Sequence, residues 1–296
     1  MAETRALARY ERDKPRGLFG RLRGAMEKWA LVQGGPELEA RLARLVAPQN
    51  EYGVDPFGME LNFTRAAIAP VLWLYKNWFR VETHGIEQVP AGKVMLIANH
   101  SGQLPFDALM LGTAMLVEAE PPRVARAMLE KWAVSLPFVA PLYARIGQVV
   151  GTPENCRRLL AAGETIMIFP EGVRGLNKLY DKKYQLQEFG RGFMRLALET
   201  QTPIVPVAVV GAEEQAPGLF DFKAGARLLG FPSLPITPTL LPLPLPVKYH
   251  LWFGAPIRFT GSPDDDDAEL DGKVREVKGQ IQSLLQHGLE ERKGIF

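Results

Sequence analysis

His100 and Asp107 are the residues of this sequence whose types and spacing are best suited to chemistry. A histidine exchanges its proton near neutral pH, and a carboxylate beside it can hold the imidazole in one tautomer. Each residue also has a simpler interpretation. Asp107 alone could be an acid favoured at a helix start, and His100 alone a hydrogen-bonded loop histidine. Together they predict a general base and the carboxylate that orients it.

A second polar segment, residues 169–175, contains Glu171, Gly172 and Arg174. A glycine lets a ligand approach the backbone closely, and a guanidinium suits a bidentate grip on phosphate. A solvated loop is the simpler interpretation of any single basic residue here. Because Arg174 lies near Glu171 and between two glycines, we expect this loop to hold a phosphate or another polar head group.

Both polar segments follow short apolar runs that are typical of strands buried on both faces. One run, Val94–Ala98, precedes His100, and the other, residues 165–169, leads into Glu171. Asp107 should lie in or near the first turn of the next helix. In α/β sheets, the carboxyl ends of the strands form the edge at which ligands bind. We therefore expect the two segments to meet at that edge.

The rest of the chain alternates between strand and helix patterns. We expect strands over 80–83, 123–129, 148–150, 203–210 and 249–253, and helices over 108–119, 155–162, 192–200 and from about 264 to 292. This order predicts an α/β fold with a single domain, in which helices flank a mixed, mostly parallel central sheet.

Composition narrows the class of protein. The chain has 296 residues, of which 47% are hydrophobic, so it can build a substantial core. Its formal net charge of +2 is too small to indicate nucleic-acid binding. The single cysteine, Cys156, excludes an internal disulfide and indicates a reducing compartment. The 4 histidines are scattered without zinc-ligand spacing, so we expect no metal site.

We expect residues 1–79 to form an N-terminal helical segment and residues 80–296 to form the main domain. Within residues 1–50, basic residues outnumber acids, and a set of apolar residues falls near helical spacing: Leu18, Phe19, Leu22, Met26, Trp29 and Ala30. Such a helix could lie on an anionic membrane, or pack on the protein's own body with its charged face solvated. Gly34–Pro36 should break it. For the aromatic stretch 63–79 we favour a core position over a membrane-interface belt.

No window resembles an ordinary membrane-spanning helix, which needs roughly 20 apolar residues. Residues 228–247 carry no charge but contain 6 prolines, so they cannot form a continuous helix. This stretch and the N-terminal helices are our candidates for the wall of an apolar groove or for a membrane-facing surface.

Over roughly residues 80–260, the motifs resemble those of the glycerophosphate and lysophosphatidic acid acyltransferases. His100 and Asp107 match the first motif of that family, residues 169–174 match its F-P-E-G-x-R motif, and residues 203–207 match its Pro-flanked apolar strand. Arg145 and residues 148–152 occupy the place of the remaining motif loosely.

The spacing departs from the family pattern at one point. Six residues, 101–106, separate His100 from Asp107, whereas the usual interval is shorter. Asp107 can reach His100 only if this loop bulges. A subgroup of bacterial glycerolipid acyltransferases looks similar in having a comparable longer loop.

The resemblance implies transfer of a fatty acyl group from a thioester to a hydroxyl of a glycerolipid such as lysophosphatidic acid. Acyl-CoA or acyl carrier protein would be the co-substrate, with no cofactor and no metal. His100 would be the base and Asp107 its partner, and the substrate would contact Glu171, Gly172, Arg174, Arg145 and Arg191.

The resemblance also implies a cytoplasmic protein bound peripherally to the inner leaflet of the membrane, with membrane lipid and an acyl thioester as its partners and no nucleic acid. An acyl-thioester hydrolase and a non-enzymatic lipid-binding protein are the alternatives. The acceptor lipid, the donor, the chain length and the oligomeric state stay open.

Overall fold

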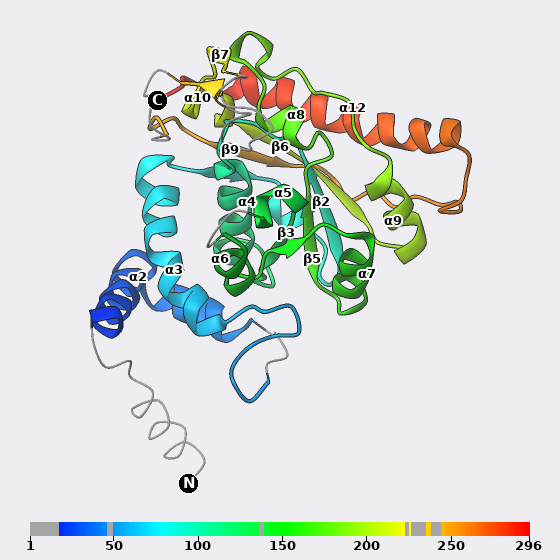
Figure 1. Cartoon of the computed structure of the whole chain (residues 1–296). Coiled ribbons are helices and arrows are strands. Elements are labelled where there is room, and N and C mark those ends of the chain that lie inside the picture. The colour runs from blue at the N-terminus through cyan, green and yellow to red at the C-terminus, as the bar shows by residue number, and fades with distance from the viewer. Residues whose placement is uncertain (1–17, 46–49, 136–138, 223–224, 226–234, 238–243) are drawn as a thin grey trace.

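The structure is a computed structural model, and it describes residues 18–45, 50–135, 139–222, 225, 235–237 and 244–296. In this part of the chain a 7-stranded sheet forms the centre of the fold, in the order β1-β9-β6-β2-β5-β3-β4 (Figure 1). The strands are β1 (Glu82–His84), β2 (Val94–Ala98), β3 (Ala125–Leu129), β4 (Val149–Val150), β5 (Thr165–Ile168), β6 (Ile204–Val210) and β9 (His250–Phe253). A separate two-stranded ribbon pairs β7 (Phe220–Asp221) with β8 (Pro235–Ile236).

The sheet is mixed and mostly parallel, as the sequence predicted. Strands β2, β5, β3 and β4 are parallel to their neighbours, and β6 joins β2 in parallel. The β6–β9 pair is antiparallel, and β1 lies parallel to β9 at the edge. Every residue of β2 and β6 is buried, which explains their unbroken apolar sequences.

Helices cover both faces of this sheet (Figure 1). Alternate residues of β2 and β6 belong to two different cores, because successive side chains of a strand point to opposite faces. One core includes α4 (Phe106–Val117), and the other includes α7 (Pro153–Ala161), α9 (Gly192–Thr200) and α12 (Asp267–Glu291). The single-domain α/β fold predicted from the sequence is confirmed.

Helix starts follow the capping signals of the sequence. The Thr152 hydroxyl accepts the Asn155 N–H at 3.2 Å, and Pro153 occupies the first turn of α7. At α12, the Asp266 carboxylate accepts the Glu269 N–H at 2.9 Å.

The remaining short helical elements are η1 (Leu74–Trp78), η2 (Ile86–Gln88), α5 (Lys131–Val134), α6 (Val139–Arg145), α8 (Val173–Leu176), η3 (Tyr180–Lys182) and α10 (Ala212–Gln215).

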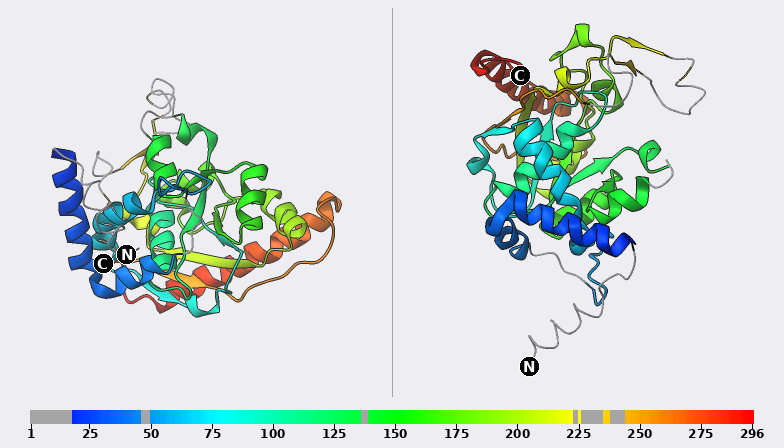
Figure 2. Two further views of the ribbon diagram at one scale, coloured as in Figure 1. Left: turned by 90° about the horizontal axis from the view of Figure 1, so that it is seen from below. Right: turned by 90° about the vertical axis from the view of Figure 1, so that its left-hand side faces the viewer.

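The N-terminal helices α2 (Leu18–Ala43) and α3 (Leu61–Trp73) lie side by side (Figure 2). The predicted break is present: Gly35 has a φ of 64° and a ψ of −168°, so α2 consists of two helices joined across a kink. Leu38 and Leu42 pack with α3 and with Leu116 of α4, which attaches the C-terminal part of α2 to the main body. Leu38 and Leu42 follow the predicted break, so both interpretations of the helix before it stay predictions.

Membrane binding by the N-terminal part of α2 stays a prediction. Residues 1–17 and the side chains of Leu18, Phe19 and Leu22 lie outside the described residues. Trp29 and Val32 are 38% and 79% exposed. Among the described helices, none is long and apolar enough to span a bilayer.

The aromatic stretch 63–79 contributes mainly to the core. Tyr75 and Phe79 are buried, at 3% and 0% exposure. Phe79 packs against Tyr249 with ring centroids 4.7 Å apart. This segment therefore packs against the sheet next to β9.

Candidate active site

His100 and Asp107 form a direct contact at the carboxyl end of β2. His100 Nδ1 lies 2.7 Å from Asp107 Oδ2, and the histidine side chain is 12% exposed while the aspartate is 0% exposed. Asp107 lies in the first turn of α4, as expected. Its Oδ2 also accepts the Ser101 N–H at 2.9 Å, and its Oδ1 accepts the Ala108 N–H at 2.7 Å. A carboxylate at Nδ1 places the ring proton there, which leaves Nε2 free to accept a proton.

The loop between the two residues bulges, and a distant side chain holds the bulge. Gly102 and Gln103 both have positive φ, at 91° and 63°. Gln215 Nε2 donates to the Gly102 carbonyl at 3.0 Å and to the Leu104 carbonyl at 3.1 Å. A Cβ at Gly102 would collide with Gln215 Nε2 and with the Ala212 carbonyl, so only glycine fits. The bulge is how Asp107 reaches His100 across the longer interval.

Asn99 anchors the start of this loop. Its side-chain amide donates to the Val209 carbonyl at 3.0 Å and accepts the Val209 N–H at 2.7 Å, which joins the end of β2 to β6. Tyr249 donates its hydroxyl to Gln215 Oε1 at 2.5 Å. Burial raises the pKa of Tyr249 well above its usual range, so the hydroxyl stays a donor. Gln215 and Tyr249 were not singled out from the sequence.

Glu171 is buried and directed at the backbone rather than into solvent. Its Oε1 accepts the His100 N–H at 3.0 Å, and its Oε2 accepts the Gln187 N–H at 2.7 Å. Lys178 Nζ lies 3.6 Å from Glu171 Oε2 and 3.0 Å from Glu213 Oε1. Burial, opposed by Lys178, raises the pKa of Glu213 to about 7. Glu171 therefore connects the F-P-E-G-x-R loop to the backbone of the histidine.

Gly172 and Arg174 lie at the accessible part of the same loop. Gly172 has a φ of 59°, and a Cβ there would lie 3.0 Å from Glu130 Oε1. The Arg174 side chain is 66% exposed, and its Nη1 lies 3.7 Å from the exposed Glu188 carboxylate. Such a surface pair is weak, so the guanidinium is available to an anion. Phe169 at the start of this loop packs on the His100 ring, with centroids 4.4 Å apart.

The structure places Arg145 and Arg191 in ion pairs outside this constellation. Arg145 makes a bidentate contact with Glu60, with both N···O distances 2.9 Å. Arg191 binds Asp271 at 2.5 and 2.7 Å. No contact described for either guanidinium involves His100. Their side chains are 44% and 40% exposed, and their contact with substrate stays a prediction.

An apolar cavity of about 410 Å³ adjoins the histidine loop. Leu104–Phe106 line one part of it, and residues of α4, α3, α6 and β3 line most of the rest. Its lining includes Ala67, Ile68, Val71, Leu104, Phe106, Leu109, Gly112, Leu116, Ala127, Leu129, Leu142, Tyr143 and Met167. Part of the wall thus comes from the N-terminal helix α3, one of our predicted sources. Residues 228–234 and 238–243 of the other predicted wall lie outside the described residues.

Glu130 is a further polar residue at this edge that the sequence reasoning missed. It follows β3 directly, just as His100 and Glu171 come shortly after β2 and β5. Its carboxylate lies next to Gly172. Its position after a predicted buried strand was the signal that could have identified it.

Comparisons with known proteins found a matching family model and several similar chains. The family model described as Acyltransferase matches residues 80–210. An uncharacterized protein of Mycobacterium leprae is 41% identical over 298 residues, which cover 92% of this chain and 80% of that protein.

More distant relatives include a Mus musculus protein named "DGAT1/2-independent enzyme synthesizing storage lipids". It is 25% identical over 211 residues, which cover 70% of this chain and 60% of that protein. Among solved structures, the 1-acyl-sn-glycerophosphate acyltransferase PlsC from Thermotoga maritima matches with a TM-score of 0.53. The match covers 91% of this chain and 97% of that chain at 15% identity, so it shows a shared fold.

Proposed function

We propose that this chain, which belongs to the acyltransferase family, transfers a fatty acyl group from an acyl thioester to a hydroxyl of a glycerolipid. The observation that carries the proposal is the 2.7 Å contact between His100 and the buried Asp107. The loop between His100 and Asp107 also contributes Leu104–Phe106 to the lining of the apolar cavity. A proton acceptor beside a compartment for a hydrocarbon chain suits acyl transfer to an alcohol.

In the proposed reaction, His100 Nε2 takes the proton of the acceptor hydroxyl while that oxygen attacks the thioester carbonyl carbon. Asp107 stabilises the imidazolium that forms. The carbon–sulfur bond then breaks, and the imidazolium returns its proton to the leaving thiolate. The products are an ester and a free thiol, and no covalent enzyme intermediate is required. General-base catalysis of this kind contributes a factor on the order of 100 to 10,000 in rate.

We propose substrate contacts on two sides of His100, in the apolar cavity and at the loop that contains Gly172 and Arg174. The apolar cavity would hold the acyl chain, since burial of each methylene stabilises the complex by about 0.8 kcal/mol. The exposed Arg174 would hold a phosphate, with Gly172 allowing close approach. Glu171 supports this arrangement by fixing the loop to His100.

We also propose that the protein is cytoplasmic and works at the inner leaflet of the membrane as a peripheral protein. Apolar side chains that support this are exposed on and beside β7: Leu219, Phe220 and Phe222 are 58%, 54% and 49% exposed. Flotation with anionic liposomes measures this binding directly. An unbound protein in that assay would contradict the proposal.

The test of the activity is a product analysis. Purified protein is incubated with acyl-CoA, or with acyl carrier protein as the alternative donor, and with a panel of lysophosphatidic acid, other lysophospholipids and neutral glycerides. The neutral acceptors are included because the Mus musculus relative is named for storage-lipid synthesis. Mass spectrometry identifies the acylated product. Free fatty acid formed at the same rate without any acceptor would instead indicate a hydrolase.

A His100→Ala variant separates the enzyme from a lipid carrier. We expect it to remain folded and to lose transfer, because Nε2 of this ring is the proposed proton acceptor. A carrier would bind lipid equally well after the substitution. Turnover retained in the folded variant would refute the role of His100.

A further inference from the structure

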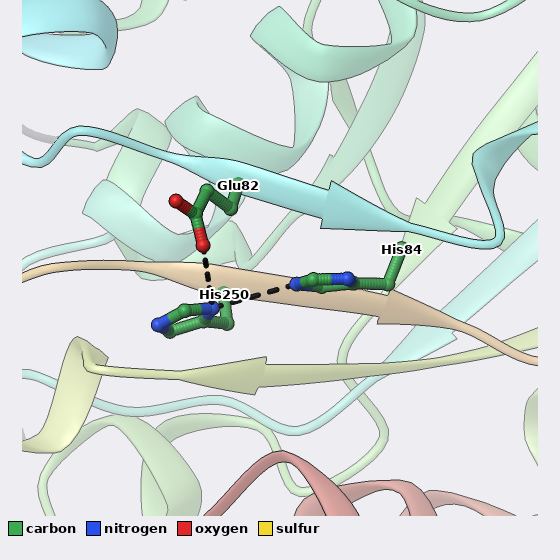
Figure 3. Close-up of side chains that lie close together, drawn as sticks. All are labelled: Glu82, His84 and His250. Carbon is green, nitrogen blue, oxygen red and sulfur yellow. Dashed lines mark hydrogen bonds and ion pairs between the residues drawn. The ribbon is translucent and has the colours of Figure 1, made fainter. Parts of the chain in front are cut away.

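A second cluster of polar side chains lies at the edge of the sheet formed by β1 and β9 (Figure 3). It contains Glu82 and His84 from β1 and His250 from β9. Glu82 and His84 are two residues apart and so point to the same face of their strand. The parallel register places Glu82 opposite His250, which brings all three side chains to one face. Strands β9 and β6 separate β1 from β2, so this cluster is distinct from the His100 loop.

The distances within the cluster are those of metal ligands rather than of good hydrogen bonds. His250 Nδ1 lies 3.4 Å from His84 Nε2 and 3.4 Å from Glu82 Oε2. Optimal N–H···O and N–H···N contacts are shorter, at about 2.7–3.2 Å. Two ligands of a tetrahedral zinc ion, each about 2.0–2.1 Å from the metal, lie roughly 3.4 Å from each other. All three ligand atoms lie within 4.8 Å of one another, so a small rotation of the exposed Glu82 side chain completes the set.

The surroundings orient the three side chains. The His84 ring stacks on Trp252, with centroids 3.8 Å apart and planes inclined by 11°. Lys248 Nζ lies 2.6 Å from Glu82 Oε1, which leaves Oε2 directed at His250. The neutral imidazole is the form of histidine that binds a metal ion. The positive charge of Lys248 opposes a cation, and we expect a moderate affinity for that reason.

We propose that Glu82, His84 and His250 bind a zinc-type dication, with water completing a tetrahedral shell. The ion would join the three-residue edge strand β1 to β9. Its two histidine ligands, one from each strand, are 166 positions apart in the sequence. Because β1 follows directly on the α3–η1 segment, the ion would fasten the N-terminal helices to the sheet. Sequence spacing does not reveal such a site, since it arises only when the two strands pair.

The test uses the full chain after removal of metals with a chelator. Zinc affinity is measured by competition with a chromophoric chelator, and we expect one zinc per chain with a Kd in the range of about 0.1–10 μM. The His84→Gln and His250→Gln variants should each weaken binding at least about 100-fold, and Glu82→Gln about 10-fold. The matched control is His100→Gln, which removes one histidine from the other cluster and should bind zinc as tightly as the parent chain.

Thermal unfolding gives an independent readout. At free zinc about 100 times the Kd, the Tm of the parent chain and of His100→Gln should rise by about 5 °C, while that of His84→Gln should not change. Should the histidine variants fail to fold without metal, the half-exposed Glu82 supplies the decisive variant through Glu82→Gln. A parent chain with a Kd above roughly 100 μM would overturn the proposal. So would unaltered zinc binding in the folded His84→Gln or Glu82→Gln variant, or binding lost only in His100→Gln.

Discussion

Asp107→Asn is the substitution that most directly tests the proposed chemistry. It keeps the shape of the side chain but removes the negative charge and turns one acceptor into a donor. In the structure, Asp107 Oδ2 accepts from His100 and from the Ser101 N–H, and Oδ1 accepts from the Ala108 N–H. All three groups present protons to the carboxylate, so an amide cannot satisfy them together.

Both orientations of the asparagine side chain impair the base. With its NH₂ toward His100, the amide donates to Nδ1 and moves the ring proton to Nε2, where it blocks proton acceptance. With its NH₂ toward Ala108, the Nδ1–H contact survives, but the imidazolium loses its counter-charge and two N–H groups face each other. We expect kcat to fall by about 1,000- to 10,000-fold, which corresponds to roughly 4–5.5 kcal/mol in the barrier.

The assay is acyl transfer with saturating donor and acceptor, followed by mass spectrometry of the product. Circular dichroism and thermal unfolding establish that the variant is folded. Asp264→Asn, at an exposed position, is the matched control and should keep full activity. A folded Asp107→Asn protein with kcat within about tenfold of the parent would refute the pairing of His100 and Asp107 as the catalytic unit.

Three further predictions address the cavity, the buried charges and pH. Gly112→Leu should project into the apolar cavity past Met167 and lower kcat/KM for long-chain thioesters about 30-fold relative to short-chain ones, as a chain-length series would measure. Asp55→Ala leaves the buried Arg126, bound at 2.6 Å, without its closest partner and should lower the free energy of unfolding by about 3–5 kcal/mol in urea titrations, whereas no change would contradict it. Because the folded pKa of Glu213 is raised to about 7 from 4.5, its contribution to stability is greatest below pH 4.5 and falls by up to about 3 kcal/mol as pH rises through 7. Unfolding titrations of Glu213→Gln should lack this pH-dependent part, and an unaltered profile would exclude it.

The sequence predicted the positions that depend on local patterns. The runs ending before His100 and Glu171 are both strands of the parallel part of the sheet, because short, uninterrupted apolar segments with polar ends are typical of strands buried on both faces. The Thr152 cap and the start of α12 were predictable for the same local reason.

Features formed by distant residues could not be predicted in this way. Gln215 holds the Gly102 carbonyl across 113 positions, and no local pattern marks it. Arg145 and Arg191 were predicted to contact substrate, and the fold also pairs them with acidic residues 85 and 80 positions away. Glu171 was expected to contact a head group, whereas the fold directs both of its oxygens to backbone N–H groups. A basic or acidic residue in a sequence carries no sign of which opposite charge the fold will bring to it.

The bulged loop of residues 101–106 has two neighbours at once. Its C-terminal end places Asp107 beside the imidazole, and Leu104–Phe106 line the apolar cavity. Any insertion, deletion or bulky replacement in this short segment therefore alters the fatty-chain compartment and the acid–base pair together. Chain-length selectivity and kcat therefore depend on the same loop. Variants selected for a change in one of them should also change in the other.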